Sequence, residues 1–158
     1  VLELDTKENT PILSVYGGKV TTFRCLAEEA MEKLHPHLGF SAEPWTQHAS
    51  LPGGEMGYEG FPAFKEEMQN SYPWLGEAQA ARMTKAYGTN LTSLLGDATS
   101  LDELGQHFGA GLYEAELIYM RDNEWACTAE DALWRRSKLG LHMTEAERAA
   151  VKEWFEKT

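Results

Sequence analysis

The first residues of the chain have the hydrophobic pattern of short β-strands. Residues 1–4 and 12–16 are short apolar runs that are partly β-branched, and turn-forming residues fill the interval between them. This pattern predicts a β-hairpin. An isolated two-stranded hairpin is only marginally stable, so we expect these strands to belong to a larger sheet.

The apolar spacing then changes from that of strands to that of a helix. From Phe23 to Leu34 apolar residues recur three and four positions apart, which predicts one continuous helical face. We expect Thr21 or Thr22 to cap the start of this helix and Pro36 to end it.

The remainder predicts a series of helices after a linker. Residues 39–60 are rich in Gly and Pro and lack periodicity, as is typical of a linker or wrapping loop. Helices are expected at residues 61–70, 75–87, 89–95, 101–108, 112–125, 128–138 and 144–157. The second of them should stop at Gly88. Helix 112–125 is apolar almost all round, as in the centre of a bundle. The last two each open with a capping-box pattern.

These elements indicate a mainly α fold with three regions. Residues 1–40 carry the hairpin and first helix, residues 41–60 the linker, and residues 61–158 an all-helical domain. An isolated hairpin and helix at the start would suit the truncated end of an α/β domain.

Charge and residue usage exclude several classes of function. The net charge is −11, with 14 basic against 25 acidic residues, so nucleic acid is not expected as a partner, even though the two capped helices resemble a helix-turn-helix in outline. The five histidines match no zinc spacing, and we predict no metal site. Cys25 and Cys127 are isolated and indicate reduced packing residues. The sequence contains no apolar run of membrane-spanning length.

One segment combines features that suit an anionic ligand. Residues 12–24 read as a strand, then Gly17-Gly18-Lys19, then the start of a helix. Glycines let a ligand approach the backbone, and a helix N-terminus offers N–H groups and a partial positive charge. Lys19 adds a full charge there. From spacing alone, a plain strand-to-helix turn with a surface lysine is favoured over a ligand site, because Gly-Gly-Lys by itself is a weak signal.

The same segment resembles a family signature. Tyr16-Gly17-Gly18-Lys19-Val20-Thr21-Thr22-Phe23-Arg24 is similar to a motif of flavin-dependent glycerol-3-phosphate dehydrogenases. Three later stretches agree with that family in the same order, at residues 51–54 (Leu-Pro-Gly-Gly), 113–119 and 131–141. The resemblance covers the whole chain. No Gly-x-Gly-x-x-Gly motif follows a strand, so we expect the C-terminal part of such an enzyme, without its pyrophosphate-binding turn.

The resemblance implies a cofactor and roles for individual residues. It implies that the parent enzyme binds FAD and that the Gly-Gly-Lys turn lies against the flavin. The cofactor-binding residues it implies are Gly17, Gly18, Lys19, Val20 and Thr21. Lys19 is expected to stabilise negative charge electrostatically in the full-length enzyme, while the fragment alone should hold no cofactor and be inactive.

The resemblance also implies a reaction, partners and a location. The parent would oxidise sn-glycerol 3-phosphate to dihydroxyacetone phosphate and pass electrons through FAD to quinone. It would be cytoplasmic and peripheral at the cytoplasmic face of the membrane. The fragment would dock on the missing FAD and substrate domain, contact a second copy in a homodimer, or shape the substrate entrance.

Three alternatives remain open from the sequence. Arg135-Arg136 could contact phosphate or another domain, or Arg135 could pair with Asp131 four residues earlier. The amphipathic helix that starts near Thr22 could pack in a core or lie on a membrane. Finally, the chain could be a free-standing helical interaction module with a dispensable beginning.

Overall fold

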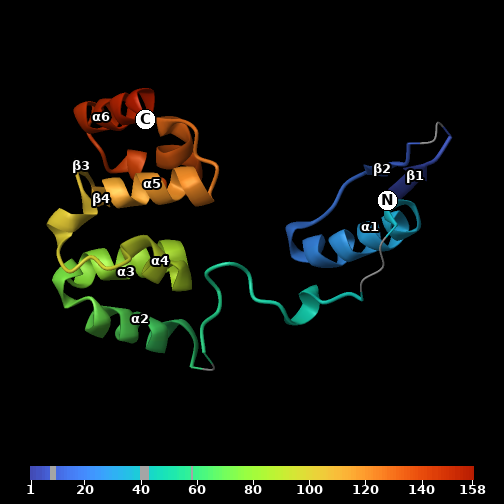
Figure 1. The fold of residues 1–158 in the computed structure, drawn as a ribbon, viewed down its shortest axis with the longest axis horizontal. Helices are drawn as coiled ribbons and strands as arrows, with labels where there is room; N and C mark the ends of the chain where they lie inside the picture. Colours follow the sequence, from blue (N-terminus) through green and yellow to red (C-terminus); the bar gives the residue numbers. More distant parts are fainter. Residues whose placement is uncertain (8–9, 40–42, 58) are drawn as a thin grey trace. The chain divides into compact units, whose positions relative to one another are not determined.

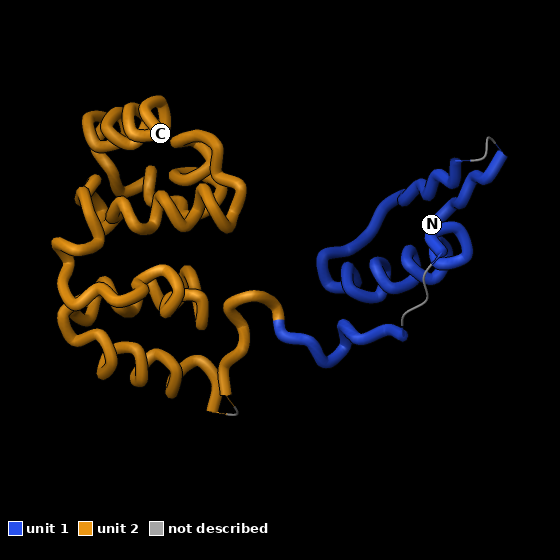
Figure 2. The backbone as a smooth tube through the Cα atoms, in the orientation of Figure 1, with its two compact units in different colours: residues 1–50 blue, residues 51–158 orange. Residues whose placement is uncertain are grey.

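The computed structural model describes residues 1–7, 10–39, 43–57 and 59–158. The chain divides into two compact units, Val1–Ser50 and Leu51–Thr158 (Figure 2). Parts of two predicted segments, Glu8 and Asn9 in the hairpin turn and residues 40–42 and 58 in the linker, lie outside the described residues. Helices dominate the described chain, and the sheets are two small two-stranded ones, so the predicted mainly α fold is confirmed.

Unit 1 consists of the predicted hairpin and one long helix. Strands β1 (Leu2–Asp5) and β2 (Ile12–Val15) pair antiparallel with Leu2 opposite Val15. A 3₁₀ turn, η1 (Val20–Thr22), leads directly into α1 (Phe23–Leu38), and a second, η2 (Thr46–His48), follows later. None of the described residues of unit 1 is buried. The hairpin and helix therefore form secondary structure without a core of their own.

Helix α1 runs further than the sequence predicted. Pro36 lies inside it, and the helix ends only at Leu38, where Gly39 takes the left-handed conformation with φ 69°. Proline removes one backbone donor, but a left-handed glycine is the stronger stop signal because it turns the chain out of the helix. The prediction that Pro36 ends the helix was therefore wrong by one half-turn.

Unit 2 is a stack of helices with a continuous apolar core (Figure 1). Its helices are α2 (Gly60–Ser71), α3 (Glu77–Tyr87), α4 (Leu91–Leu95), α5 (Glu114–Asn123) and α6 (Glu145–Lys157). They are joined by the short turns η3 (Pro73–Leu75), η4 (Gly88–Asn90), η5 (Leu101–Leu104) and η7 (Leu139–Leu141), and by the π-helix η6 (Asp131–Arg136). Helix α2 packs on α3, and α4 packs on α5. Met83, Leu112, Leu117 and Val151 are fully buried at the centre.

A hairpin replaces the helix predicted at residues 101–108. The 3₁₀ turn η5 stops at Gly105, and β3 (His107–Gly109) then pairs with β4 (Leu112–Tyr113). Ala110 and Gly111 join the strands with φ values of 49° and 74°. Two consecutive positive φ values are the requirement of a type I′ hairpin turn, and they prevent a helix from crossing this point.

Helix α5 is also less apolar than predicted. It begins at Glu114 because the two preceding residues form β4. Ile118 is 41% exposed, while Glu116 on the opposite side is fully buried. The helix therefore has one buried side and one exposed side, which corrects the prediction of a helix apolar all round.

The predicted capping boxes are present. At α6 the Thr144 hydroxyl accepts from the Glu147 N–H at 3.3 Å, and the Glu147 carboxylate accepts from the Thr144 N–H at 2.7 Å. At η6 the Thr128 hydroxyl accepts from the Asp131 N–H at 3.1 Å, and Asp131 accepts in return from the Thr128 N–H at 3.0 Å. Both reciprocal pairs satisfy donors that a helix start leaves without a partner.

Candidate functional site

The candidate site is the turn that joins β2 to α1. The N–H of Tyr16 donates to the carbonyl of Val1 at 2.9 Å, which extends the hairpin pairing to the edge of the turn. Gly17 and Gly18 follow with φ values of 80° and 144°, a backbone that residues with a side chain rarely adopt. The direction of the chain at this turn therefore depends on both glycines.

The geometry of the turn leaves its backbone open on one side. A Cβ placed on Gly17 would meet nothing within 4 Å, so this glycine borders free space. A Cβ on Gly18 would lie 3.3 Å from the Leu26 side chain, so this glycine lets the turn sit against α1. A flat ring can approach a backbone of this kind without meeting a side chain.

Lys19 and the first residues of the helical segment complete the site. Lys19 is extended and exposed, and its carbonyl accepts from the Thr22 N–H at 3.0 Å and from the Thr22 hydroxyl at 3.3 Å. Val20 is 89% exposed and Thr21 is also exposed. The structure thus brings all five predicted site residues into one turn at a helix start, with a lysine beside the N–H groups that lack a partner within the helix. Thr22 occupies the N-cap position, but its hydroxyl bonds to Lys19 and does not cap the helix.

A polar cluster stands one turn along the same helix. Arg24 Nη1 lies 2.8 Å from Glu28 Oε1 and donates to the Thr46 hydroxyl at 3.3 Å, while that hydroxyl donates to Glu28. The Thr46 hydroxyl, together with Arg24, lowers the pKa of Glu28. Sequence analysis did not single out this cluster, although Arg24 and Glu28 stand at the i, i+4 spacing that could have indicated it.

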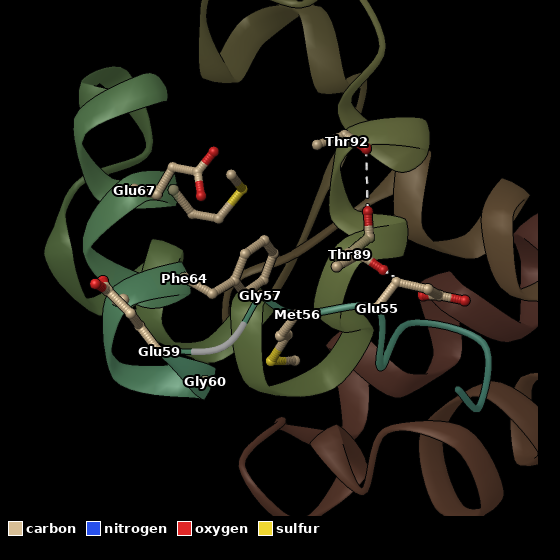
Figure 3. Close-up of a pocket in the computed structure, with 11 residues that line it drawn as sticks. Glu55, Met56, Gly57, Glu59, Gly60, Phe64, Glu67, Thr89 and Thr92 are labelled. Carbon is tan, nitrogen blue, oxygen red and sulfur yellow. Dashed lines mark hydrogen bonds between the residues drawn. The ribbon is translucent and has the colours of Figure 1, made fainter. Parts of the chain in front are cut away.

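The cavity in unit 2 has a different character. It measures about 640 Å³, and the residues that line it include Glu55, Glu59 and Glu67 together with apolar residues such as Phe64 (Figure 3). The Thr89 hydroxyl donates to Glu55 at 2.7 Å and lowers the pKa of that carboxyl. The charged residues among the described residues that line the cavity are acidic, and they include no lysine or arginine to pair with a phosphate group.

A buried ion pair connects two helices of unit 2. Arg82 on α3 donates to both oxygens of Glu116 on α5, at 2.9 and 2.7 Å, and the Tyr87 hydroxyl donates to the same carboxylate at 2.9 Å. Burial, with the Glu116 charge, raises the pKa of Tyr87 well above its ordinary value. Sequence analysis missed this network because nothing in local spacing links residues 34 positions apart.

The later stretches of the family signature have structural roles here. Residues 51–54 form a turn against Gly88, where the Thr89 N–H donates to the Gly53 carbonyl at 3.0 Å. Arg135 pairs with Asp131 at 2.9 Å, as the simpler of the two alternatives for this residue predicted. Arg136 Nε donates to the Glu124 carbonyl at 2.7 Å. Trp134 lies so close to Gly140 that a Cβ there would come within 2.8 Å of the indole ring.

Comparison with known proteins identifies the family. Residues 44–156 match the family described as the C-terminal domain of alpha-glycerophosphate oxidase. The chain belongs to this family. The matched range contains all of unit 2 except its last two residues, so the helical stack is the part of the chain that corresponds to this family.

Several curated relatives extend the similarity to unit 1. The chain is 42% identical over 156 residues to D-erythritol 1-phosphate dehydrogenase of Brucella abortus, covering 99% of this chain and 31% of that protein. It is 41% identical over 152 residues to aerobic glycerol-3-phosphate dehydrogenase of Escherichia coli, covering 96% and 30%. Against glycerol-3-phosphate dehydrogenase of Pseudomonas aeruginosa it is 42% identical over 146 residues, covering 92% and 28%. The chain spans about three-tenths of the length of these relatives.

The described residues contain no group of three or more His, Cys, Asp and Glu side chains placed to bind a metal ion. None of the helices in this part of the chain combines the length and apolar character needed to cross a membrane.

Proposed function

We propose that the chain is the C-terminal part of an FAD-dependent dehydrogenase that oxidises sn-glycerol 3-phosphate to dihydroxyacetone phosphate. The observation that carries the proposal is the open Gly-Gly-Lys turn at a helix start, in a chain whose relatives are named dehydrogenases of polyol phosphates. When bound, FAD would accept the hydride from the substrate.

In this proposal the residues of the turn hold the flavin and stabilise charge. Gly17 and Gly18 leave room for the ring, and the backbone N–H groups of Val20 and Thr21 face it at a helix start. Such a start carries roughly half a positive charge, and Lys19 adds a full one. Together they would favour the negative charge that develops as the cofactor is reduced, because the donors are already oriented before the reaction.

Exposed apolar side chains in unit 1 suit an upstream domain as the partner of this unit. Ile12 is 60% exposed, Tyr16 58% and Phe23 56%. We propose that the FAD and substrate domain covers them and extends the hairpin into a larger sheet. Membrane contact by α1 is the less favoured alternative because its polar side carries Glu28, Glu29 and Glu32, which anionic lipids repel.

We also propose an electron acceptor for the enzyme and a role for unit 2. Electrons would leave through quinone, which would place the full-length enzyme at the cytoplasmic face of the membrane. Unit 2, which has a complete core of its own, would dock on the upstream domain, contact a second copy or shape the substrate entrance. A free-standing interaction module is the competing function, and that same self-contained core is the observation in its favour.

The test uses the full-length gene product. We expect it to bind flavin, seen as visible absorbance, and to oxidise glycerol 3-phosphate. Replacing Lys19 with Met should lower kcat/KM by about 100-fold, the usual effect of removing one oriented donor, while Lys19→Arg should retain part of the rate. Lys7→Met, which removes an exposed lysine from the hairpin turn of the same unit, is the matched control and should leave the rate unchanged.

The alternatives predict different results in the same assay. A full-length protein without flavin would contradict the proposal and favour the interaction module. A higher kcat/KM with D-erythritol 1-phosphate than with glycerol 3-phosphate would support the same type of reaction on a different substrate. Co-sedimentation of the 158-residue chain with anionic liposomes would assign the apolar side of α1 to the membrane.

A further inference from the structure

Two clusters anchor the connecting chain, one on each side of the boundary between the units. The first is the cluster on α1, where Arg24 and Glu28 hold the Thr46 hydroxyl at the start of η2. The turn itself is closed by the Ala49 N–H, which donates to the Thr46 carbonyl at 3.4 Å. The chain is therefore fixed to unit 1 up to Ala49.

The second cluster begins immediately after the boundary. The Gly54 N–H donates to the Leu51 carbonyl at 2.7 Å, and Gly53 has a φ of 81°, which with Pro52 before it makes a type II turn. This turn is fastened to η4, because the Thr89 N–H donates to the Gly53 carbonyl at 3.0 Å and the Thr89 hydroxyl donates to Glu55 at 2.7 Å.

The contact between the turn and η4 is too close to permit side chains. A Cβ on Gly53 would lie 2.6 Å from the Tyr87 carbonyl oxygen, and a Cβ on Gly88 would overlap the backbone of Gly53. Gly53 and Gly88 are both buried, so this anchor is part of the packed structure of unit 2.

We propose that Ala49–Leu51 is a hinge and that these two anchors confine the relative motion of the units to it. Within the described part of the predicted linker, Ser50 is the residue that neither anchor holds, and Ala49 and Leu51 border it. Three residues span at most about 10 Å when extended, so the hinge permits rotation and little translation. This inference concerns the chain itself and does not depend on the flavin or the substrate.

Spin labels can test the hinge in the 158-residue chain. One label goes on native Cys127 in unit 2, and the other on Glu3→Cys in β1, with Cys25 changed to Ser; all three positions are exposed. Pulsed dipolar spectroscopy then gives the distribution of distances between the units. We expect Ser50→Pro to narrow it, since Ala49 already has the extended backbone (φ −83°, ψ 133°) that a following proline requires.

Releasing either anchor should have the opposite effect. Thr46→Val removes the hydroxyl between Arg24 and Glu28 and should broaden the distribution. Thr89→Val removes the bond to Glu55 but keeps the bond from the Thr89 N–H to the Gly53 carbonyl, so it should broaden the distribution less. Thr46→Val should also speed amide exchange at Ala49 by about three- to tenfold, the equivalent of one lost hydrogen bond. The controls are Thr22→Val and Thr92→Val, whose hydroxyls bond only to carbonyls three residues earlier.

Two outcomes would overturn the hinge. If Thr46→Val and Thr89→Val leave both the distribution and the exchange rates as in the wild type, the anchors do not restrain the chain. If Ser50→Pro leaves the width of the distance distribution unchanged, the flexible point of the chain lies at other residues. Because Ser50 lies outside both anchors, this variant remains informative even where an anchor variant disturbs the fold of its unit.

Discussion

Arg82 and Glu116 form the residue contact with the largest expected effect on stability. Glu116 is fully buried, and Arg82 is its only cationic partner within the described residues. Arg82→Met would leave a buried carboxylate without its counter-charge, so we expect the free energy of unfolding to fall by about 3 kcal/mol, at the low end for such pairs because the Arg82 side chain is still 24% exposed. Urea denaturation followed by circular dichroism measures this.

The matched controls for Arg82 separate charge from packing. Adding Glu116→Leu to Arg82→Met should recover part of the loss, since both charges are then absent while the buried Tyr87 hydroxyl loses its acceptor. Arg135→Met breaks an ion pair in which the arginine is 54% exposed, and should cost less than about 1 kcal/mol. Equal losses for Arg82→Met and Arg135→Met would contradict a special role for the buried pair.

Gly88 and Gly96 provide a second comparison at the residue scale. Their backbones are nearly the same, with φ 54° and ψ −137° at Gly88 and φ 52° and ψ −129° at Gly96. Alanine is therefore about equally strained at both. Only at Gly88 would the added Cβ meet other atoms, those of Gly53.

We therefore expect Gly88→Ala to destabilise unit 2 more than Gly96→Ala. The difference should exceed about 1 kcal/mol, because overpacking adds to the strain that both variants share. Thermal or urea unfolding of the two single variants gives the comparison. Equal destabilisation would mean that the turn at residues 51–54 can move away from the added Cβ at no cost in free energy, and that it is not anchored to η4.

At the scale of elements, prediction succeeded where local signals determine structure. The capping residues Thr128 and Thr144 marked their helix starts correctly because a cap depends on residues three apart. Gly88 marked the end of α3 for the same reason. The roles of Gly17, Gly18, Lys19, Val20 and Thr21 toward a flavin stay a prediction.

The failures concern contacts between distant residues or unusual backbones. The helix expected at residues 101–108 stops after one 3₁₀ turn, because Gly105 takes a φ of 79° and His107 then pairs with Tyr113 in a hairpin. The two anchors around Ser50 depend on bonds from Thr46 and Thr89 to residues 18 and 34 positions away. Periodicity carries no information on such pairs.

The cap of α6 predicts a pH dependence at the element scale. Bonds from the Thr144 N–H and hydroxyl lower the pKa of Glu147 in the folded state. A lowered folded pKa stabilises the helix above the ordinary carboxyl pKa, and this contribution is lost as the pH falls through the folded value. We therefore expect α6 to loosen progressively below about pH 4.5, the ordinary Glu value.

Glu147→Gln tests this assignment. The glutamine keeps a side-chain oxygen that can accept from Thr144 but does not titrate, so the variant should lose part of the acid dependence of stability while remaining folded at neutral pH. Denaturation midpoints between pH 3 and 7 supply the measurement, with Glu156→Gln in the last turn of α6 as the control. Parallel pH curves for wild type and Glu147→Gln would refute the role of this carboxylate.

At the scale of the whole molecule, the two units should differ in stability. Unit 2 contains all the buried apolar residues of the described chain, whereas unit 1 contains none. Backbone hydrogen bonds without covering side chains open easily, because little apolar surface returns to water when they break. We expect amides of β1, β2 and α1 to exchange orders of magnitude faster than those of α5, and heating to show two transitions.

The same experiment on the full-length gene product gives that prediction its functional meaning. If the upstream domain covers unit 1, amides in β2 and α1 should become protected to the level of α5, while those of α5 should change little because their core is already complete. Protection of unit 1 in the isolated chain would mean that it needs no partner, and would favour the free-standing module. Hydrogen exchange therefore tests the domain contact separately from flavin binding and catalysis, since it needs neither cofactor nor substrate.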